Sequence, residues 1–266
     1  MTRDEIRHLQ AQLNKVGALL KADGLIGGNT KRAVREARAL AGLPPGEEVD
    51  SALLGWLDEQ PAPSPDLPVR GVTFIAQEEV GGRAFYEAHT AMPHWPGVAS
   101  GITIGVGYDL RFSEDIFEQD WGDKLPEELL AALRPHLGRR GSRAAAEALA
   151  DFRVPWTTAW QVFIGRSLPP QVERTRGTYE TLDRLPGLCR SVLVSLVFNR
   201  GASLQDDPGS DRRLEMRRIR GLLEQERLDE VPAQILAMRR LWPESRGLRD
   251  RREREADLWL EGLSSA

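Results

Sequence analysis

Apolar side chains recur at helical spacing near the start of the chain. Thr2 and Glu5 have the spacing of a capping box, in which each side chain accepts a hydrogen bond from the other residue's backbone. Four apolar residues then follow at the three- and four-residue intervals of an amphipathic helix: Ile6, Leu9, Leu13 and Val16. The pattern predicts a first helix with one buried face.

Two more short helices are expected before residue 60. Asn29 or Thr30 follows a glycine-rich turn and is placed to cap a helix that ends near Leu40. A third helix is expected over residues 50–57, with three side chains near the core: Leu53, Leu54 and Trp56. Three such helices form a small bundle.

Helical patterns also dominate the second half of the chain. After a short segment at residues 72–76 and a loop-rich region, periodic apolar positions predict helices over residues 126–137, 143–152, 157–164, 188–199, 214–226, 232–241 and 249–260. Residues 191–198 are apolar on nearly every side, which predicts the central buried helix. Gly201 stands where a helix C-terminal glycine belongs.

The segment PAPSPDLP at residues 61–68 divides the chain. Four prolines in eight residues favour an extended, semi-rigid spacer. We therefore expect an N-terminal domain over residues 1–60, a linker over 61–70 and a larger domain over 71–266.

Residues 102–108 alternate in a way that is typical of a β-strand. Ile102, Ile104 and Val106 share one face, and Thr103 lies on the other with two glycines, Gly105 and Gly107. A straight strand would separate Thr103 from Asp109 by about 20 Å, at ~3.3 Å per residue. Because two glycines lie between them, we expect a tight hairpin that returns Asp109 toward Thr103. The fold class is therefore mainly α, with a small β-hairpin (α+β).

Three polar residues of this region have the chemistry of glycoside hydrolysis, which needs one carboxylic acid and a second carboxylate. In inverting enzymes the two carboxyl groups lie roughly 6.5 to 9.5 Å apart. Glu79 has apolar sequence neighbours, which favour the protonated form that a general acid needs. Asp109 is expected to stay ionised and, with the Thr103 hydroxyl, to orient the attacking water.

The N-terminal residues resemble the peptidoglycan-binding domain that accompanies many cell-wall hydrolases. The resemblance covers residues 4–57 and is carried by Leu9-Gln10, Leu13, Gly17, the run Asp23-Gly24-Leu25-Ile26-Gly27 and residues 30–34. It implies a three-helix bundle that binds peptidoglycan. A generic bundle, whose glycines only supply positive φ angles, is the alternative.

Residues 71–259 resemble the lysozyme-like fold of bacteriophage-type muramidases, and most closely its pesticin-like branch. The matching motifs are Glu79, the run Ser100-Gly101-Ile102-Thr103 that enters the hairpin, and Asp109 six residues after the Thr. Residues 193–201 and 247–259 are similar to the central and closing helices of the family. The resemblance implies that Glu79, Thr103 and Asp109 are catalytic.

A second pair of carboxylates, Glu78 and Glu87, has the spacing that phage lysozymes show between their two acidic residues. Those enzymes place an Asp about nine residues after the Glu, a position that is Ala88 counted from Glu79 and Glu87 counted from Glu78. Glu78 and Glu87 are therefore the alternative catalytic residues. We favour Glu79 because, as in the family, it directly precedes Val80-Gly81-Gly82 and stands seven residues before a tyrosine.

Four residues of the presumed cleft are candidate substrate contacts: Trp95, Gly105, Gly107 and Tyr108. Trp95 either stacks on a sugar ring or packs its loop, and the sequence does not separate the two. The glycines would leave room for a ligand beside the backbone. We assign loop roles to His89 and His94, because the sequence shows no set of metal ligands around them. Four other tryptophans are assigned to core packing: Trp156, Trp160, Trp242 and Trp259.

The composition narrows the possible partners. Hydrophobic residues make up 41% and charged residues 29% of the 266 residues, values typical of a globular protein. The formal net charge of −4 gives no global attraction to nucleic acid, although residues 212–254 hold 13 arginines against 8 acidic residues. The longest apolar run is far shorter than the ~20 residues of a membrane span. Cys189 is the only cysteine, and we expect it to be buried and unreactive.

The sequence thus predicts a monomeric, bacteriolytic muramidase whose partner is bacterial peptidoglycan. It would cleave the β-1,4 bond between N-acetylmuramic acid and N-acetylglucosamine without a metal or other cofactor and without inserting in a membrane. Two alternatives stay open: a lytic transglycosylase and a non-catalytic wall-anchoring protein. The first residues have no signal-peptide pattern. We therefore expect synthesis in the cytoplasm and release to the cell wall by a holin or a secretion system, most simply as an endolysin.

Overall fold

The computed structural model describes residues 1–97 and 99–265. Val98, in the predicted loop before the hairpin, and Ala266, the last residue of the predicted larger domain, lie outside the described residues. The chain divides into two compact units. Unit 1 contains Met1–Pro63 and Glu79–Leu168, and unit 2 contains Ser64–Glu78 and Pro169–Ala266. One division falls inside the proline-rich segment, directly after Pro63.

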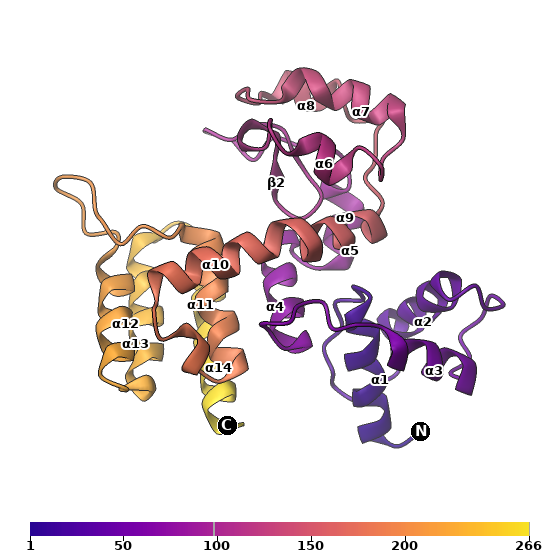
Figure 1. The fold of residues 1–266 in the computed structure, drawn as a ribbon, viewed down its shortest axis with the longest axis horizontal. Helices are drawn as coiled ribbons and strands as arrows, with labels where there is room; N and C mark the ends of the chain where they lie inside the picture. Colours follow the sequence, from indigo (N-terminus) through magenta and orange to yellow (C-terminus); the bar gives the residue numbers. More distant parts are fainter. Residues whose placement is uncertain (98, 266) are drawn as a thin grey trace. The chain divides into compact units, whose positions relative to one another are not determined.

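Helices make up most of both units, which confirms the mainly helical fold class. The described strands are two short ones, β1 (Thr103–Ile104) and β2 (Tyr108–Asp109), which pair in an antiparallel hairpin (Figure 1). Among the described helices, none is both long enough and apolar enough to cross a membrane.

The N-terminal part of unit 1 is the predicted three-helix bundle, formed by α1 (Arg3–Lys15), α2 (Gly28–Leu40) and α3 (Ser51–Glu59). The predicted capping box is present: the Thr2 hydroxyl accepts the Glu5 N–H, and the Glu5 carboxylate accepts the Thr2 N–H. The side chains that fill the centre of the bundle are fully buried and include Leu9, Leu13, Ala37, Leu53 and Leu57. Burial of these apolar faces drives the three short helices together.

Two predicted details of the bundle are wrong. The N-cap of α2 is Gly27, and no side chain caps this helix. Thr30 is buried instead, where its hydroxyl accepts a hydrogen bond from the Gln10 amide (3.2 Å), so it cannot serve as the cap. Leu54 is 36% exposed, because the core face of α3 carries Leu53 and Leu57.

The rest of unit 1 consists of short helical segments around the hairpin. They are α5 (Arg83–Phe85), the π-helical turn η1 (Tyr86–Thr90), η2 (Leu110–Phe112), α6 (Phe117–Trp121), α7 (Glu127–Leu133), η3 (Arg134–His136), α8 (Arg143–Glu147), α9 (Trp156–Val162) and the π-helical turn η4 (Phe163–Ser167).

The bundle packs directly on α9, within unit 1. The Trp156 indole N–H donates to the carbonyl of Gly17 (2.7 Å), and the Trp160 indole N–H donates to the carbonyl of Lys15 (3.3 Å). Both rings are buried, which confirms their predicted packing role. Gly17 has a φ of +85°, and a Cβ at this position would lie 2.7 Å from the Trp160 ring. The turn after α1 therefore packs closely against the two indole rings and accepts a hydrogen bond from each.

Unit 2 is built from longer helices. It contains all or most of α4 (Val69–Val80), α10 (Leu168–Thr178), η5 (Leu182–Arg184), α11 (Gly187–Arg200), α12 (Leu214–Glu224), η6 (Leu228–Glu230), α13 (Val231–Ala237), η7 (Met238–Leu241) and α14 (Arg246–Ser264). The sequence pattern does not predict α10, because Pro169 and Pro170 are typical of loops. These prolines come just after the π-helical turn η4, which itself continues α9, and such a local departure from α-helical hydrogen bonding accommodates residues that have no backbone N–H.

The predicted central helix, α11, is buried along residues 191–197, and Gly201 ends it with a φ of +78°, as predicted. Cys189 on this helix is fully buried, and burial raises the pKa of its thiol to about 12. The thiol therefore stays protonated, as expected of a structural cysteine.

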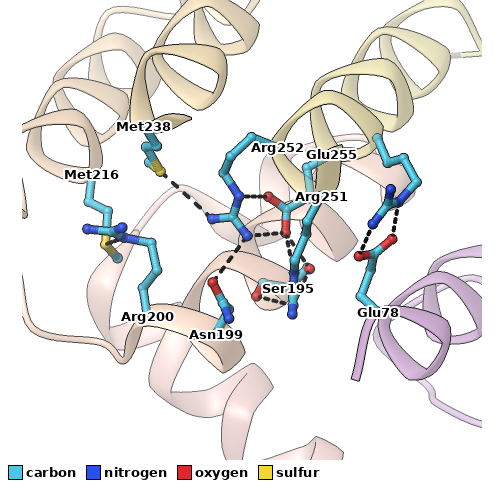
Figure 2. A network of polar contacts seen from close by, with 10 residues as sticks. Glu78, Ser195, Asn199, Arg200, Met216, Met238, Arg251, Arg252 and Glu255 are labelled. Carbon is cyan, nitrogen blue, oxygen red and sulfur yellow. Dashed lines mark hydrogen bonds and ion pairs between the residues drawn. The ribbon is translucent and has the colours of Figure 1, made fainter. Parts of the chain in front are cut away.

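A buried ionic cluster joins α11 to α14 (Figure 2). One oxygen of the fully buried Glu255 carboxylate accepts hydrogen bonds from the Ser195 hydroxyl (2.6 Å) and from both Arg251 (3.2 Å) and Arg252 (3.1 Å). Its other oxygen lies 3.0 Å from Nε of Arg252. Buried charges persist only when paired and hydrogen-bonded in this way.

The tight contact at Gly17 yields a stability prediction. Gly17→Ala should lower the free energy of unfolding by about 2 kcal/mol or more, because the new methyl group meets Trp160 and a positive φ disfavours L-residues. Urea unfolding followed by circular dichroism measures this loss. Gly55→Ala is the matched control, since Gly55 lies inside α3 with no atom near its Cβ position; it should be neutral or stabilising. Equal stability of the two variants would contradict the packing described.

Candidate functional site

The hairpin brings two of the three predicted catalytic residues together. In its register Thr103 lies opposite Asp109, and Ile104 lies opposite Tyr108. Both backbone groups of Thr103 pair with His94 on the other side of the strand, at 2.7 and 3.0 Å. Thr103 and Asp109 are thus a non-hydrogen-bonded pair, the kind in which facing side chains approach most closely, with Cα atoms about 4.5 Å apart. The predicted return of Asp109 toward Thr103 is confirmed.

The carboxylate of Asp109 binds the loop that leads into the hairpin. Its Oδ1 accepts the N–H groups of Gly101 and Arg111, both at 2.9 Å, and its Oδ2 also accepts the Gly101 N–H at 3.1 Å. A Cβ at residue 101 would lie 2.5 Å from Oδ1, so only glycine allows this approach. The side chain is half-buried and also caps η2.

The apolar face of the hairpin segment is buried. Ile102, Ile104 and Val106 are all buried. Gly105 has a φ of +56°, and a Cβ there would lie 2.9 Å from the Trp121 ring. Trp121 thus fills the space beside Gly105, contrary to the expectation that this glycine leaves room for a ligand. Gly107, with a φ of +68°, is exposed at the turn.

Tyr108 is part of the hairpin's support. Its ring is 7% exposed and meets Trp121 edge to face at 5.4 Å. Its hydroxyl donates to Asp120 (2.9 Å), which also lies 3.4 Å from the guanidinium of Arg166. Burial, aided by the neighbouring Asp120, raises the pKa of Tyr108 above its ordinary value. This hydrogen bond anchors β2 and occupies the Tyr108 hydroxyl. A substrate contact by Tyr108 therefore requires the exposed edge of its ring.

Trp95 and His94 line the segment before the strand. The Trp95 indole N–H donates to the carbonyl of Ser100 (3.2 Å), and its ring lies against Gly141, so this half-buried side chain packs its own loop. Burial lowers the pKa of His94, whose Nδ1 lies 3.3 Å from the carbonyl of Met92. In the described chain, no group of three or more His, Cys, Asp and Glu side chains is arranged to hold a metal ion.

Glu78 and Glu79 occupy the last turns of α4, where both are half-buried. Glu78 belongs to unit 2, where Nε and Nη2 of Arg254 donate to its two carboxylate oxygens at 2.6 and 2.8 Å (Figure 2). Both oxygens of Glu78 are therefore committed to a guanidinium. Glu79 belongs to unit 1, the unit that holds the hairpin, and is followed by the buried Val80.

Glu87, the other alternative, lies on η1 in a network of ion pairs. Its carboxylate accepts hydrogen bonds from Arg83 (2.5 and 3.2 Å) and lies 3.5 Å from Arg32. Arg83 is 7% exposed and also donates to both oxygens of Glu36 on α2, at 2.9 and 3.1 Å. This network attaches the N-terminal bundle to η1, which is a structural task for Glu87.

The sequence pattern does not predict the groups that fix the hairpin. Gly101 belongs to a motif, but the motif does not show that its N–H donates to Asp109, and no pattern points to Arg111 or Asp120. The run from Ser100 to Thr103, with a glycine just before a strand, is a signal that indicates a close backbone approach.

Comparison with known protein families identifies the N-terminal bundle. Residues 2–57 match the family described as "Putative peptidoglycan binding domain". The chain therefore carries a peptidoglycan-binding domain in α1–α3, which supports association with the cell wall and peptidoglycan as a partner. No curated protein sequence shows significant similarity to the chain.

The hydrogen bonds of Asp109 predict different effects for two substitutions. Asp109→Ala leaves the Gly101 and Arg111 N–H groups without their acceptor and should destabilise unit 1 by about 1 to 3 kcal/mol. Asp109→Asn retains an oxygen at the Oδ1 position and should lose less than half as much. Chemical denaturation measures both, with Asp123→Ala as a control at a side chain that is 78% exposed. A smaller loss for Asp109→Ala than for Asp109→Asn would refute this role.

Burial of the tyrosines predicts a loss of stability in alkali. Burial raises the pKa of all three, Tyr86, Tyr108 and Tyr179. Above about pH 10 the unfolded chain loses phenol protons that the folded chain keeps, so the free energy of unfolding should fall by about 1.4 kcal/mol per pH unit for each tyrosine.

Urea unfolding between pH 8 and 11 tests this prediction. Tyr108→Phe and Tyr179→Phe should each reduce the slope of the unfolding free energy against pH. Only Tyr108→Phe should lower stability at pH 7 through a lost hydrogen bond, since the Tyr179 hydroxyl has no partner among the described residues. An unchanged slope in both variants would show that the tyrosines are not responsible.

Proposed function

We propose that the protein is a muramidase that cleaves the β-1,4 bond between N-acetylmuramic acid and N-acetylglucosamine in bacterial peptidoglycan. Glu79 is the general acid that protonates the leaving oxygen. Asp109 and Thr103 position the water that attacks the anomeric carbon. The observation that carries this proposal is the pairing of Thr103 with Asp109 across the hairpin, in a chain with a peptidoglycan-binding domain.

The geometry of the hairpin suits the water-positioning role. On facing strand residues, the Thr103 hydroxyl can donate a hydrogen bond to a water and the Asp109 carboxylate can accept one from the same water. The two N–H bonds at Oδ1 hold the carboxylate of Asp109 in place, while Oδ2 accepts the longer bond from Gly101. Positioning that is complete before the substrate binds costs no rearrangement during the reaction.

Glu79 is assigned as the acid because it belongs to the unit that holds the hairpin and has buried apolar neighbours. Glu78 has both oxygens bound to Arg254, and Glu87 is bound to Arg83 and Arg32. These contacts give Glu78 and Glu87 structural roles. Glu79 has apolar neighbours on its own helix, Ile75 and Val80, both of which are buried.

The wall-binding domain gives the proposed enzyme its location. It packs on α9 through Trp156 and Trp160, in the unit that also holds the hairpin. A domain that binds the polymer raises the local concentration of glycosidic bonds at the proposed catalytic residues. We place this action at the cell wall, which the chain reaches from the cytoplasm through a holin or a secretion system, as an endolysin does.

A lytic transglycosylase is the second candidate, and one observation favours it. Three backbone hydrogen bonds occupy the Asp109 carboxylate, which gives it a structural task that needs no catalytic role. A transglycosylase needs only one glutamate, and the C6 hydroxyl of the muramic acid replaces water as the nucleophile. Its product then carries a 1,6-anhydro end.

Substitution of each glutamate tests the assignment of the acid. Glu79→Gln should reduce the release of soluble fragments from purified peptidoglycan by at least about 10³-fold, because an amide cannot donate the required proton. Folding, measured by circular dichroism, and binding to sedimented peptidoglycan should be unchanged. Glu78→Gln and Glu87→Gln should retain most of the activity. A folded Glu79→Gln variant that still clears peptidoglycan suspensions would rule out this role.

A further inference from the structure

A polar cavity of about 540 Å³ lies in unit 2, at the end of α11. We call it the Arg200 pocket and define it by six of its lining residues: Asn199, Arg200, Asp206, Arg212, Arg213 and Trp242. Its lining residues come from the end of α11, the loop that follows α11 and the segment before α14. None of the proposed catalytic residues, Glu79, Thr103 and Asp109, lines this pocket.

Two guanidinium groups of the pocket lack an acidic partner. Arg200 donates to the sulfur of Met216 (3.4 Å, Figure 2) and to the carbonyl of Arg212, and Arg213 donates to the carbonyl of Arg200 and to the same sulfur (3.5 Å). All of these acceptors are neutral. Within the part of the chain that the structure describes, neither arginine has a carboxylate at ion-pair distance.

Two acidic residues nearby, Asp206 and Glu215, are engaged elsewhere, whereas Asp207 also lines the pocket and forms no ion pair with Arg200 or Arg213 among the described residues. Asp206 is paired with Arg217 (2.8 Å) and accepts the backbone N–H of Arg213 (2.7 Å). Glu215, which is 2% exposed, is paired with Arg240 (2.5 Å). Burial and the like charges of Arg213 and Arg252 lower the pKa of Arg200 to about 10. Three arginines line the pocket against two aspartates, so its wall has a net positive charge.

Trp242 supplies a flat apolar surface beside this charge. The guanidinium of Arg200 lies over its ring at 5.1 Å and that of Arg252 at 5.5 Å. The ring is half-buried and lines the cavity, so the predicted assignment of Trp242 to core packing is only partly right. An aromatic face next to charged donors suits a sugar or peptide that also bears an anionic group.

We propose that the Arg200 pocket binds a carboxylate of the peptidoglycan chain, borne either by the lactyl group of N-acetylmuramic acid or by the peptide attached to it. Arg200 and Arg213 pair with the carboxylate, and Trp242 packs against the attached ring or peptide backbone. The pocket would then recognise the acidic sugar of the polymer and not the neutral one. This inference rests on peptidoglycan as the partner, but not on the chemistry proposed for Glu79.

Binding of small probes tests the proposal by NMR on the ¹⁵N-labelled full chain. N-acetylmuramic acid presents the lactyl carboxylate. In N-acetylmuramyl-L-alanyl-D-isoglutamine the lactyl group is an amide, and the peptide presents the carboxylate. N-acetylglucosamine lacks both. We expect saturable shifts of the Trp242 indole and Arg200 Nε signals with one or both acidic probes, and which of them binds identifies the source of the carboxylate.

Substitutions complete the test. Arg200→Gln and Arg213→Gln should each weaken binding of the acidic probe by about tenfold or more, while Arg200→Lys, which keeps the charge, should weaken it less. Arg246→Gln is the matched control at a side chain that is 89% exposed, and binding should be unchanged. The Glu79→Gln chain should bind the probe normally, so failure of the catalytic proposal would be seen separately.

Three results would overturn the proposal: no saturable shift with either acidic probe, equal binding of N-acetylglucosamine, or unaltered binding by folded Arg200→Gln and Arg213→Gln variants.

Discussion

The carboxylate of Asp109 accepts N–H groups from two separate turns of the chain, and the candidate site depends on this constraint. Through Gly101 it fixes the loop that enters β1, and through Arg111 it fixes the turn that leaves β2. The loop can come this close only because residue 101 has no side chain. Thr103 and Asp109 then face each other in a hairpin of only two residues per strand, which could not hold its shape by strand pairing alone.

The remainder of unit 1 supports this arrangement. Trp121 closes the space beside Gly105, and Tyr108 anchors β2 through Asp120. The peptidoglycan-binding domain is attached to the same unit by the two indole hydrogen bonds of α9 and by the ion pairs of Arg83. The peptidoglycan-binding domain and the hairpin proposed to cut the polymer therefore belong to one compact unit.

Local patterns predicted those parts of the fold that local physics determines. The capping box at Thr2, the buried course of α11 and the return of Asp109 toward Thr103 follow from spacing within about ten residues. The errors have a different origin. Gly27 in place of Thr30 as the cap of α2 and the filled space beside Gly105 both depend on residues that arrive from elsewhere in the chain.

Long-range ion pairs account for most of what the sequence could not predict at the site. Glu78 is paired with Arg254, 176 residues away, and Glu87 with Arg32 from another helix of unit 1. Nothing in the spacing of charged residues indicates these partners. Arg200 and Arg213, which have no carboxylate partner among the described residues, are equally hard to predict in a segment that is simply rich in arginine.

The central claim is that the hairpin and Glu79 direct water to a glycosidic bond of peptidoglycan. Mass spectrometry of the fragments that the intact chain releases from purified peptidoglycan tests this most directly. The account predicts fragments that end in reducing N-acetylmuramic acid, with one water added for each bond broken. Fragments with 1,6-anhydro ends, or with reducing N-acetylglucosamine ends, or no fragments at all, would contradict it.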